Sequence, residues 1–397
     1  LCYSLSSWNT ISSVPRPMDP AILQPDFLLD IFGDSIEFLS FLKVVNSFGF
    51  FVAISFIISS WILGKELRRK EREGKLSSFK VKEIVGEKLK PSQLIASGVM
   101  GFVFGYKLLG VVFAIYTEDK LNTQEYLLSG QGNVLAGLAV AAYMMYTKYK
   151  EVKKAELPEP KEVTKEMHPY QLVGNITMLA AVFGLIGAKI FHHLENFEDF
   201  LKNPSQILDP FSGLTYYGGL LMASVAILVF LKRKGVKLIP VLDSAGPTLI
   251  AAYGMGRMGC HISGDGDWGI SNLAAKPNWL SWAPDWVWAY DYPNNVIGAD
   301  PGLVFPTPFY EILMMGFVFL ILWNIRKKIT IPGVMFGLYL VFNGLERFLI
   351  EKIRVNTHVW GTITQAEIIS SGLMRAGIVM IVVMYKKNKQ QGTELPV

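Results

Sequence analysis

The chain has 397 residues, of which 51% are hydrophobic and 18% are charged, and its formal net charge at pH 7 is +5. With a mean hydropathy of +0.33, this composition excludes an ordinary soluble protein and predicts a membrane protein with several spans. The basic residues gather at the ends of apolar runs. That pattern sets membrane topology, so no nucleic-acid partner is expected.

Nine apolar runs follow one another along the chain, and most approach the length of about 20 residues that crosses a bilayer. They cover residues 44–63, 94–116, 134–146, 172–191, 214–231, 238–255, 303–323, 334–350 and 368–385. Every second connection is basic, which places the N-terminus outside and the C-terminus in the cytoplasm. We therefore predict an all-α, polytopic integral membrane protein with about nine transmembrane helices.

The sequence also predicts where the regions around these runs lie relative to the membrane. Residues 1–43 are expected to form an N-terminal extracytoplasmic arm, 44–387 the membrane domain and 388–397 a cytoplasmic tail. An outer loop, 267–302, is rich in tryptophan and tyrosine. Aromatic rings suit the membrane interface, so this loop is expected either to anchor the protein there or to cover a pocket as a lid.

The stretch 242–269 departs from the apolar pattern. It ends in repeated glycines and in the side chains Arg257, Cys260, His261, Asp265 and Asp267. A charge near the membrane centre costs roughly 3 kcal/mol or more, so something other than lipid must solvate these groups. Glycine-rich turns present backbone N–H groups to anions. We therefore predict a membrane-embedded pocket for a negatively charged head group.

Three other stretches, 213–221, 304–316 and 342–354, lie on the same predicted outer side. In the last of them, Arg347, Glu351 and Arg354 are spaced to share one face of a helix. Arg257 and Arg347 are the natural pair for a phosphate, because guanidinium is permanently charged and offers forked donors. The alternative is that Glu351 only neutralises Arg347 or Arg354 at a helix end.

The sequence offers little for metal or redox chemistry. It contains no HExxH and no CxxC motif, and its five histidines are scattered, so a metal site is not expected. Cys260 is interpreted as a small apolar side chain in the core rather than a nucleophile, because no obvious base precedes it. Asp265 and Asp267 could orient an arginine or a substrate hydroxyl, or could simply belong to a turn.

The segment "GMGRMGCHISGDGDWG" resembles the signature of the bacterial prolipoprotein diacylglyceryl transferases. Further segments resemble elements of that family in the same order, from about residue 174 to 387: "FGLIGAKIFHHLENFEDFLKNPSQIL", "LTYYGGLL", "FPTPFYE" and "ERFLIEKIR". The family typically has seven spans. An inserted helical hairpin, residues 93–147, would account for the two additional runs.

The resemblance implies transfer of the diacylglyceryl group of phosphatidylglycerol to the lipobox cysteine thiol of a prolipoprotein signal peptide, with release of glycerol phosphate. It implies a bacterial cytoplasmic (inner) membrane protein whose active site faces the outer leaflet, without a cofactor. Arg257 matches the signature arginine, and Arg347, Glu351 and Arg354 match the closing helix.

The chain departs from the family pattern at three positions, one of which is Phe305, where the family has a histidine before the proline. Tyr217 stands where the family has a histidine before a glycine pair, and Cys260 stands where it has an asparagine. A phenol with a reference pKa of about 10 is a poor base at neutral pH. His261, with a reference pKa of about 6.5, is therefore a candidate for the general base.

On this basis we predict Arg257, Arg347, Tyr217 and His261 as catalytic residues. The residues predicted to bind the substrate are Gly218, Gly219, Gly256, Gly259, Asp265, Tyr310, Glu311, Glu351 and Arg354. Two other functions stay open. One is a paralogue with the same phospholipid pocket but another acceptor or no catalysis. The other is a lipid transporter, against which the lack of a strong internal repeat argues.

Overall fold

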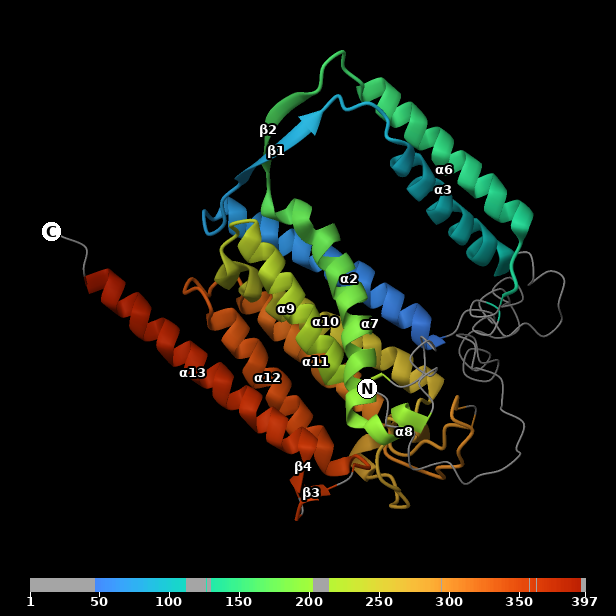
Figure 1. Cartoon of the computed structure of the whole chain (residues 1–397). Helices are drawn as coiled ribbons and strands as arrows, with labels where there is room; N and C mark the ends of the chain where they lie inside the picture. The colour runs from blue at the N-terminus through green and yellow to red at the C-terminus, as the bar shows by residue number, and fades with distance from the viewer. Residues whose placement is uncertain are drawn as a thin grey trace. The chain divides into compact units, whose positions relative to one another are not determined.

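The computed structural model of the chain describes residues 47–111, 126, 130–202, 214–293, 295–356, 358–361 and 363–393. The predicted N-terminal arm and the last four residues of the predicted tail lie outside this part. The long helices are α2 (Ser47–Arg72), α3 (Pro91–Phe104), α6 (Val134–Ala155), α7 (Val173–Glu195), α9 (Tyr216–Arg233), α10 (Leu238–Ser263), α11 (Thr307–Ile325), α12 (Val334–Ile350) and α13 (Gln365–Thr393) (Figure 1). Each of the nine predicted runs overlaps one of them.

The prediction of a polytopic membrane protein is confirmed. Among the described residues, seven helices are long and apolar enough to cross a membrane, and α6 and α12 are the long helices that do not meet both conditions. α12 has 17 residues and α6 ends in several lysines. Short strands accompany the helices, which the sequence did not predict. β1 (Phe79–Val85) pairs with β2 (Lys161–Met167), and β3 (His358–Trp360) with β4 (Ile363–Thr364).

The described chain divides into two compact units. One contains Phe48–Phe79 and the residues from His168 onward, and the other contains Lys80–Met167. In the second unit α3 continues as a π-helical turn, Gly105–Leu109, and packs against α6. Gly101 makes this possible, because a Cβ there would lie 2.8 Å from the Ala141 Cα. That α3 and α6 form an insertion stays a prediction.

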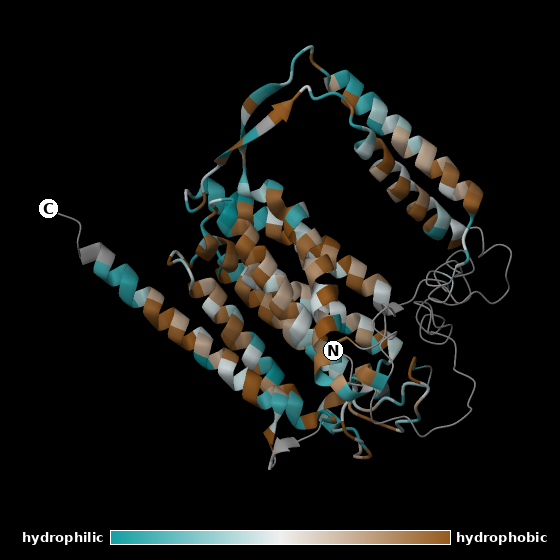
Figure 2. Ribbon diagram, viewed as in Figure 1, coloured by the Kyte–Doolittle hydropathy of each residue, from teal (hydrophilic) through white to brown (hydrophobic). Residues whose placement is uncertain are grey.

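In the first unit, the helices expose apolar side chains along their lengths. Phe317 and Leu320 on α11 are 67% and 56% exposed, and Val379 on α13 is 60% exposed. Figure 2 shows the apolar middle and polar ends of α13. Such surfaces would promote aggregation in water but are expected where lipid surrounds a helix.

Close helix pairs in this unit depend on glycine. A Cβ at Gly218 on α9 would lie 2.6 Å from the carbonyl oxygen of Gly187 on α7. A Cβ at Gly377 on α13 would lie 2.6 Å from the carbonyl oxygen of Gly337 on α12. These contacts bring backbones together as small residues do in membrane helix pairs.

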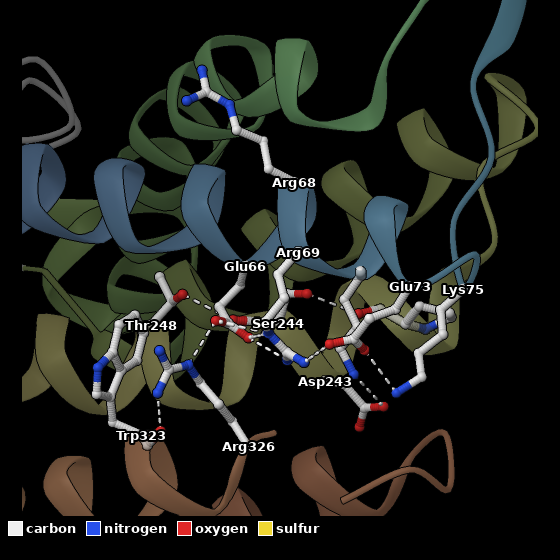
Figure 3. Close-up of polar contacts among 12 residues, drawn as sticks. Glu66, Arg68, Arg69, Glu73, Lys75, Asp243, Ser244, Thr248, Trp323 and Arg326 are labelled. Carbon is white, nitrogen blue, oxygen red and sulfur yellow. Dashed lines mark hydrogen bonds and ion pairs between the residues drawn. The ribbon is translucent and has the colours of Figure 1, made fainter. Parts of the chain in front are cut away.

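The first helix is longer than predicted, because its basic end is folded rather than a loop. Glu66 is buried on α2 and receives hydrogen bonds from Arg69 Nη2 at 2.6 Å and from Arg326 Nε at 2.8 Å, the latter at the end of α11 (Figure 3). Lys70 Nζ lies 3.6 Å from an oxygen of Asp243 on α10. These partners solvate charges that the apolar pattern alone would place in a polar loop.

Asp243 connects three elements at this end of the unit. Besides its ion pair with Lys70, its carboxylate accepts hydrogen bonds from the backbone N–H of Gly333 at 2.9 Å and of Phe336 at 3.1 Å. It therefore caps the first turn of α12 from a neighbouring helix, where orphan N–H groups and the helix dipole favour an anion.

The predicted glycine-rich anion turn is helical over its first half, so that prediction was wrong there. α10 continues to Ser263, and Gly254, Gly256 and Gly259 lie inside it. Gly264 ends the helix with a φ of 60°, and its N–H bonds to the Cys260 carbonyl oxygen at 3.0 Å. This left-handed helix end favours glycine. It turns the chain so that Asp267 comes back toward α10.

Candidate active site

A cavity of about 250 Å³ lies between α7, α9, α10, α12 and the start of α13. Its walls combine charged, aromatic and apolar side chains. They are His192, Glu195, Leu214, Thr215, Tyr216, Tyr217, Leu220, Tyr253, Arg257, Asn343, Glu346, Arg347, Glu351, Asn356, Thr364, Gln365, Ala366, Ile369, Ser370 and Leu373. The cavity therefore contains four of the predicted residues, Arg257, Arg347, Tyr217 and Glu351.

Arg257 reaches this cavity from α10 and is held by two carboxylates. Its side chain is 3% exposed. Its Nη1 pairs with Asp267, and its Nε lies 2.9 Å from a carboxylate oxygen of Glu311. Its Nη2 also donates to the Tyr253 hydroxyl at 3.2 Å. A guanidinium fixed on several sides keeps its orientation without having to be ordered by a ligand.

Arg347 approaches the same cavity from α12. Its Nη2 lies 3.0 Å from Glu351, one helical turn further along, and its Nη1 lies 3.6 Å from Glu311. Glu351 accepts a further hydrogen bond from Asn356 at 2.6 Å. Arg347 is thus neutralised by Glu351, as the alternative interpretation expected. Arg347 nevertheless belongs to the cavity lining, and its buried Nη1 has no hydrogen-bond partner among the described residues.

Arg354 lies behind the cavity wall and connects α12 with the loop that follows α10. Its Nη2 bonds to Asp267 at 2.5 Å, and its Nη1 lies 3.6 Å from Glu311. The backbone reinforces this pairing, because the Ile270 N–H bonds to the Ile353 carbonyl oxygen at 2.9 Å. Although burial opposes its ionisation, Arg354 and Arg257 hold the pKa of Asp267 well below its usual range.

Glu311 is the centre of this arrangement. It is fully buried on α11, and all three arginines lie within ion-pair distance of its carboxylate. Tyr253 adds a hydroxyl that donates to it at 3.0 Å. Two regions distant in sequence, α10 and the end of α12 with the segment after it, therefore present three arginines to one carboxylate, and two of these arginines also line the cavity.

The predicted glycines contribute through packing. Gly218 and Gly219 face α7 rather than the cavity, and a Cβ at Gly219 would lie 2.8 Å from the Gly184 carbonyl oxygen. Their close approach to α7 positions the preceding Tyr216 and Tyr217 at the cavity wall. Gly256 and Gly259 lie within α10 and are not part of the lining.

His261 and Tyr310 occupy a neighbouring aromatic cluster. The Nδ1 atom of His261 lies 3.0 Å from the Tyr292 hydroxyl, and its ring also packs against Trp286 and Phe309. Tyr310 donates its hydroxyl to the Val287 carbonyl oxygen at 2.9 Å. Neither residue is among those that line the cavity. Both instead fasten the outer aromatic loop to the ends of α10 and α11.

None of the described residues of that loop lines the cavity either, which favours the interfacial interpretation over the lid. Trp279 and Trp282 are 72% and 80% exposed, and Leu273 is 83% exposed. Asn272 secures the loop from inside through a hydrogen bond to the Trp288 carbonyl oxygen at 2.7 Å. Exposed tryptophans on a fixed loop suit the lipid head-group region.

Asp265 and Asp267 have different environments. Burial, with the neighbouring charge of Asp267, raises the pKa of Asp265 to about 6. Cys260, Asp265 and Asp267 offer ligand atoms within 4.8 Å of one another. Both oxygens of Asp267 already pair with arginines, at Arg257 and Arg354. Two guanidinium groups beside a carboxylate do not fit a bound cation.

Two residues of the arrangement were not among the predicted site residues. Asp267 was considered but not chosen over Asp265, and the structure pairs it with both Arg257 and Arg354. Glu346 precedes Arg347 in the sequence and had no signal of its own, since an acid beside an arginine is common on helix surfaces. It is 3% exposed and lines the cavity.

Comparison with known proteins agrees with this geometry. The family model described as prolipoprotein diacylglyceryl transferase matches residues 134–383, which is more than half of the chain. The chain belongs to this family. The matched region contains each of the site residues above.

Relatives with the name phosphatidylglycerol–prolipoprotein diacylglyceryl transferase are moderately similar. One from Clostridium novyi (strain NT) is 27% identical over 216 residues, covering 54% of this chain and 80% of the relative. One from Streptococcus pyogenes serotype M5 (strain Manfredo) is 23% identical over 262 residues, covering 65% of this chain and 90% of the relative. The membrane transferase family predicted from the sequence is therefore confirmed.

Proposed function

We propose that this protein transfers the diacylglyceryl group of phosphatidylglycerol to the cysteine thiol of a prolipoprotein signal peptide and releases glycerol phosphate. The observation that carries the proposal is the convergence of Arg257 and Arg347 on one cavity inside a membrane bundle. Membership of the family and the names of the relatives supply the donor and the acceptor.

The cavity suits a head group better than a whole phospholipid. At about 250 Å³ it is at the small end of ligand pockets, which typically measure about 300–1,000 Å³. The glycerol phosphate portion would occupy the polar interior beside the arginines, while the acyl chains remain among the apolar helix faces. Sulfur attack on the glycerol carbon then displaces the phosphate, and the arginines stabilise the charge that develops on it.

Arg257 and Arg347 are preorganised to stabilise negative charge on the leaving group. Arg257 and Arg347 share Glu311, so their guanidinium groups are held close to each other before any ligand enters. A preorganised cation pair does not reorganise as charge moves onto the leaving group. Tyr217 lines the same cavity and can position the lipid or the acceptor by a hydrogen bond. His261 would have to act as a base from outside the lining.

The proposal includes a location. The family suggests a bacterial cytoplasmic membrane. The alternating basic connections support an orientation in which the N-terminus is outside and the C-terminus is cytoplasmic. In that orientation the cavity end, at the C-termini of α7, α10 and α12, faces the outer leaflet. Phosphatidylglycerol and the signal peptide of an exported preprotein both reach that leaflet.

A paralogue that binds the lipid but uses another acceptor is the second candidate. The observation that favours it is Tyr217, which replaces the family histidine at the cavity wall. The two functions differ in whether a lipobox thiol is modified, so one experiment separates them.

That experiment is complementation in a bacterium depleted of its own transferase. Lipidation of a model prolipoprotein is followed by gel shift and by incorporation of labelled lipid. We expect the wild-type chain to restore the lipidated form and Arg257→Ala and Arg347→Ala not to, at equal expression. Tyr217→Phe and His261→Gln, compared in the same strain, test the two other predicted catalytic residues. A well-expressed wild-type chain that restores nothing would leave the paralogue as the better proposal.

A further inference from the structure

Glu346 is an unusual carboxylate within the cavity. It is 3% exposed, and both of its carboxylate oxygens lack a hydrogen-bond partner among the described residues. No described lysine, arginine or histidine makes an ion pair with it. Asn343, one turn earlier on α12, and Tyr253 on α10 line the same cavity.

A buried carboxylate without partners lowers the stability of the folded protein. Burying a polar atom without a hydrogen bond costs stability, and burying an unpaired charge costs more. A buried carboxylate with two open acceptor atoms therefore needs either a ligand that supplies donors or a proton. The Glu346 side chain also belongs to the lining of the cavity that a ligand would enter.

The charges around Glu346 favour the uptake of a proton by its carboxylate. Three arginines and three carboxylates of the site form mutual ion pairs: Arg257, Arg347 and Arg354 with Asp267, Glu311 and Glu351. The charges of these six residues cancel without Glu346. An ionised Glu346 adds a negative charge beside the place where a phosphate would bind, and a protonated Glu346 removes it.

We propose that Glu346 is the general base that accepts the proton of the acceptor thiol during transfer. The inference rests on the proposed transferase function. The proton passes from sulfur to the Glu346 carboxylate as the sulfur electron pair forms a bond with the glycerol carbon. The bond between that carbon and the phosphate oxygen breaks, and its electron pair stays on the oxygen. Glycerol phosphate leaves with a second negative charge, and the proton later returns to water or to the phosphate.

The direction of this proton transfer suits the charges at the site. Negative charge leaves the carboxylate while the phosphate gains one, so the total charge beside the arginines stays constant through the reaction. The charged groups that act on Glu346 are Glu311 from α11, Arg257 from α10, Arg347 from its own helix and Arg354 from the segment after it. α13 contributes Gln365 and Ser370 to the cavity, which do not titrate.

Other candidates in the cavity fit the role less well. His192 lies on the α7 side, where its Nδ1 atom is 3.4 Å from the Asn196 amide nitrogen. Tyr217 has a phenol, which is protonated at neutral pH and cannot accept the thiol proton. Glu346 combines a carboxylate without a described hydrogen-bond partner, a place in the cavity lining and an electrostatic interaction with both Arg257 and Arg347.

The test uses the purified full-length chain with phosphatidylglycerol micelles and a lipobox peptide. Transfer is measured as a function of pH for the wild type, Glu346→Gln, Glu346→Asp and the control Glu198→Gln, an exposed acid on the short helix α8 (Phe197–Lys202). We expect Glu346→Gln to lower kcat by about 10²–10⁴-fold, the usual contribution of a general base. The KM for the lipid stays unchanged, since the arginines remain.

The pH profile separates a base from a structural residue. The kcat of Glu346→Gln should rise with pH as the thiol ionises by itself, with a reference pKa of about 8.5, so that the deficit of this variant relative to the wild type shrinks at high pH. Glu346→Asp should recover part of kcat and the wild-type profile. If Glu346→Gln retains the wild-type kcat, or raises only the KM, the inference is overturned while the transferase function stands. If the wild type transfers nothing to the peptide, both the transferase function and the role of Glu346 are refuted.

Discussion

Glu311→Gln is the substitution that should destabilise the site most. The carboxylate is fully buried, with guanidinium nitrogens of Arg257, Arg347 and Arg354 at 2.9, 3.6 and 3.6 Å. Glutamine keeps the shape and can still accept the Tyr253 hydroxyl, but it removes the charge. Two carboxylates, Asp267 and Glu351, then remain for three arginines.

The expected loss of stability follows from the burial of these charged groups. Removing one partner of a buried ion pair typically costs about 3–5 kcal/mol, because the opposite charge is left uncompensated. For a unit of this size, that corresponds to a Tm lower by on the order of 10 °C. Transfer activity should fall as well, since Arg257 and Arg347 lose the group that orients both of them.

Thermal unfolding in detergent micelles measures this effect, with Glu198→Gln as the matched control. Glu198 is exposed on α8, so the same chemical change there should alter stability by less than about 0.5 kcal/mol. A Glu311→Gln protein with the Tm of the wild type would refute the conclusion that Glu311 compensates the three arginines.

Three further substitutions test other parts of the structure. Gly219→Ala should lower stability by about 1–3 kcal/mol through the clash with the Gly184 carbonyl, whereas Gly174→Ala, with open space around it, should not; equal Tm values would disprove the close α7–α9 contact. Asp243→Asn should cost about 1–3 kcal/mol in chemical unfolding, since it weakens the α12 cap and an ion pair; an unchanged midpoint would contradict this. Asp265 has a pKa of about 6 in the folded protein, above its reference value. The free energy of unfolding should therefore fall by about 3 kcal/mol as pH rises from about 4 to 6, because the folded protein disfavours the ionised carboxyl. Asp265→Asn should remove that loss, and a variant with the wild-type pH dependence of Tm would show that this carboxyl is not responsible.

Much of the membrane core could be predicted from local sequence. The run 334–350 became α12 with the same bounds, because it begins after Gly333, which has a φ of 90°, and its apolar residues continue to Ile350. Long apolar runs are a strong signal because lipid requires each span to satisfy its own backbone. The arginine pair was predictable too, because a charge within such a run needs a special reason.

Other features depended on partners that are distant in the sequence. α2 extends through its basic end because Lys70 pairs with Asp243 on α10 and Glu66 pairs with Arg326 at the end of α11. No local sequence pattern predicts these partners. Arg354 bonds to Asp267, 87 residues away, and the sequence alone could not choose between Asp265 and Asp267. The glycines of α10 remained helical because tertiary packing outweighs their weak helix propensity, as where Gly254 lies against Met315.

The central claim is that this cavity transfers a diacylglyceryl group from phosphatidylglycerol to a thiol. The most direct test incubates the purified chain with a lipobox peptide and phosphatidylglycerol labelled separately in its diacylglyceryl and head-group portions. We predict that the peptide gains the diacylglyceryl label on its cysteine and that one glycerol phosphate carrying the head-group label is released for each peptide modified. A peptide that stays unmodified while the lipid remains bound and intact would contradict the claim.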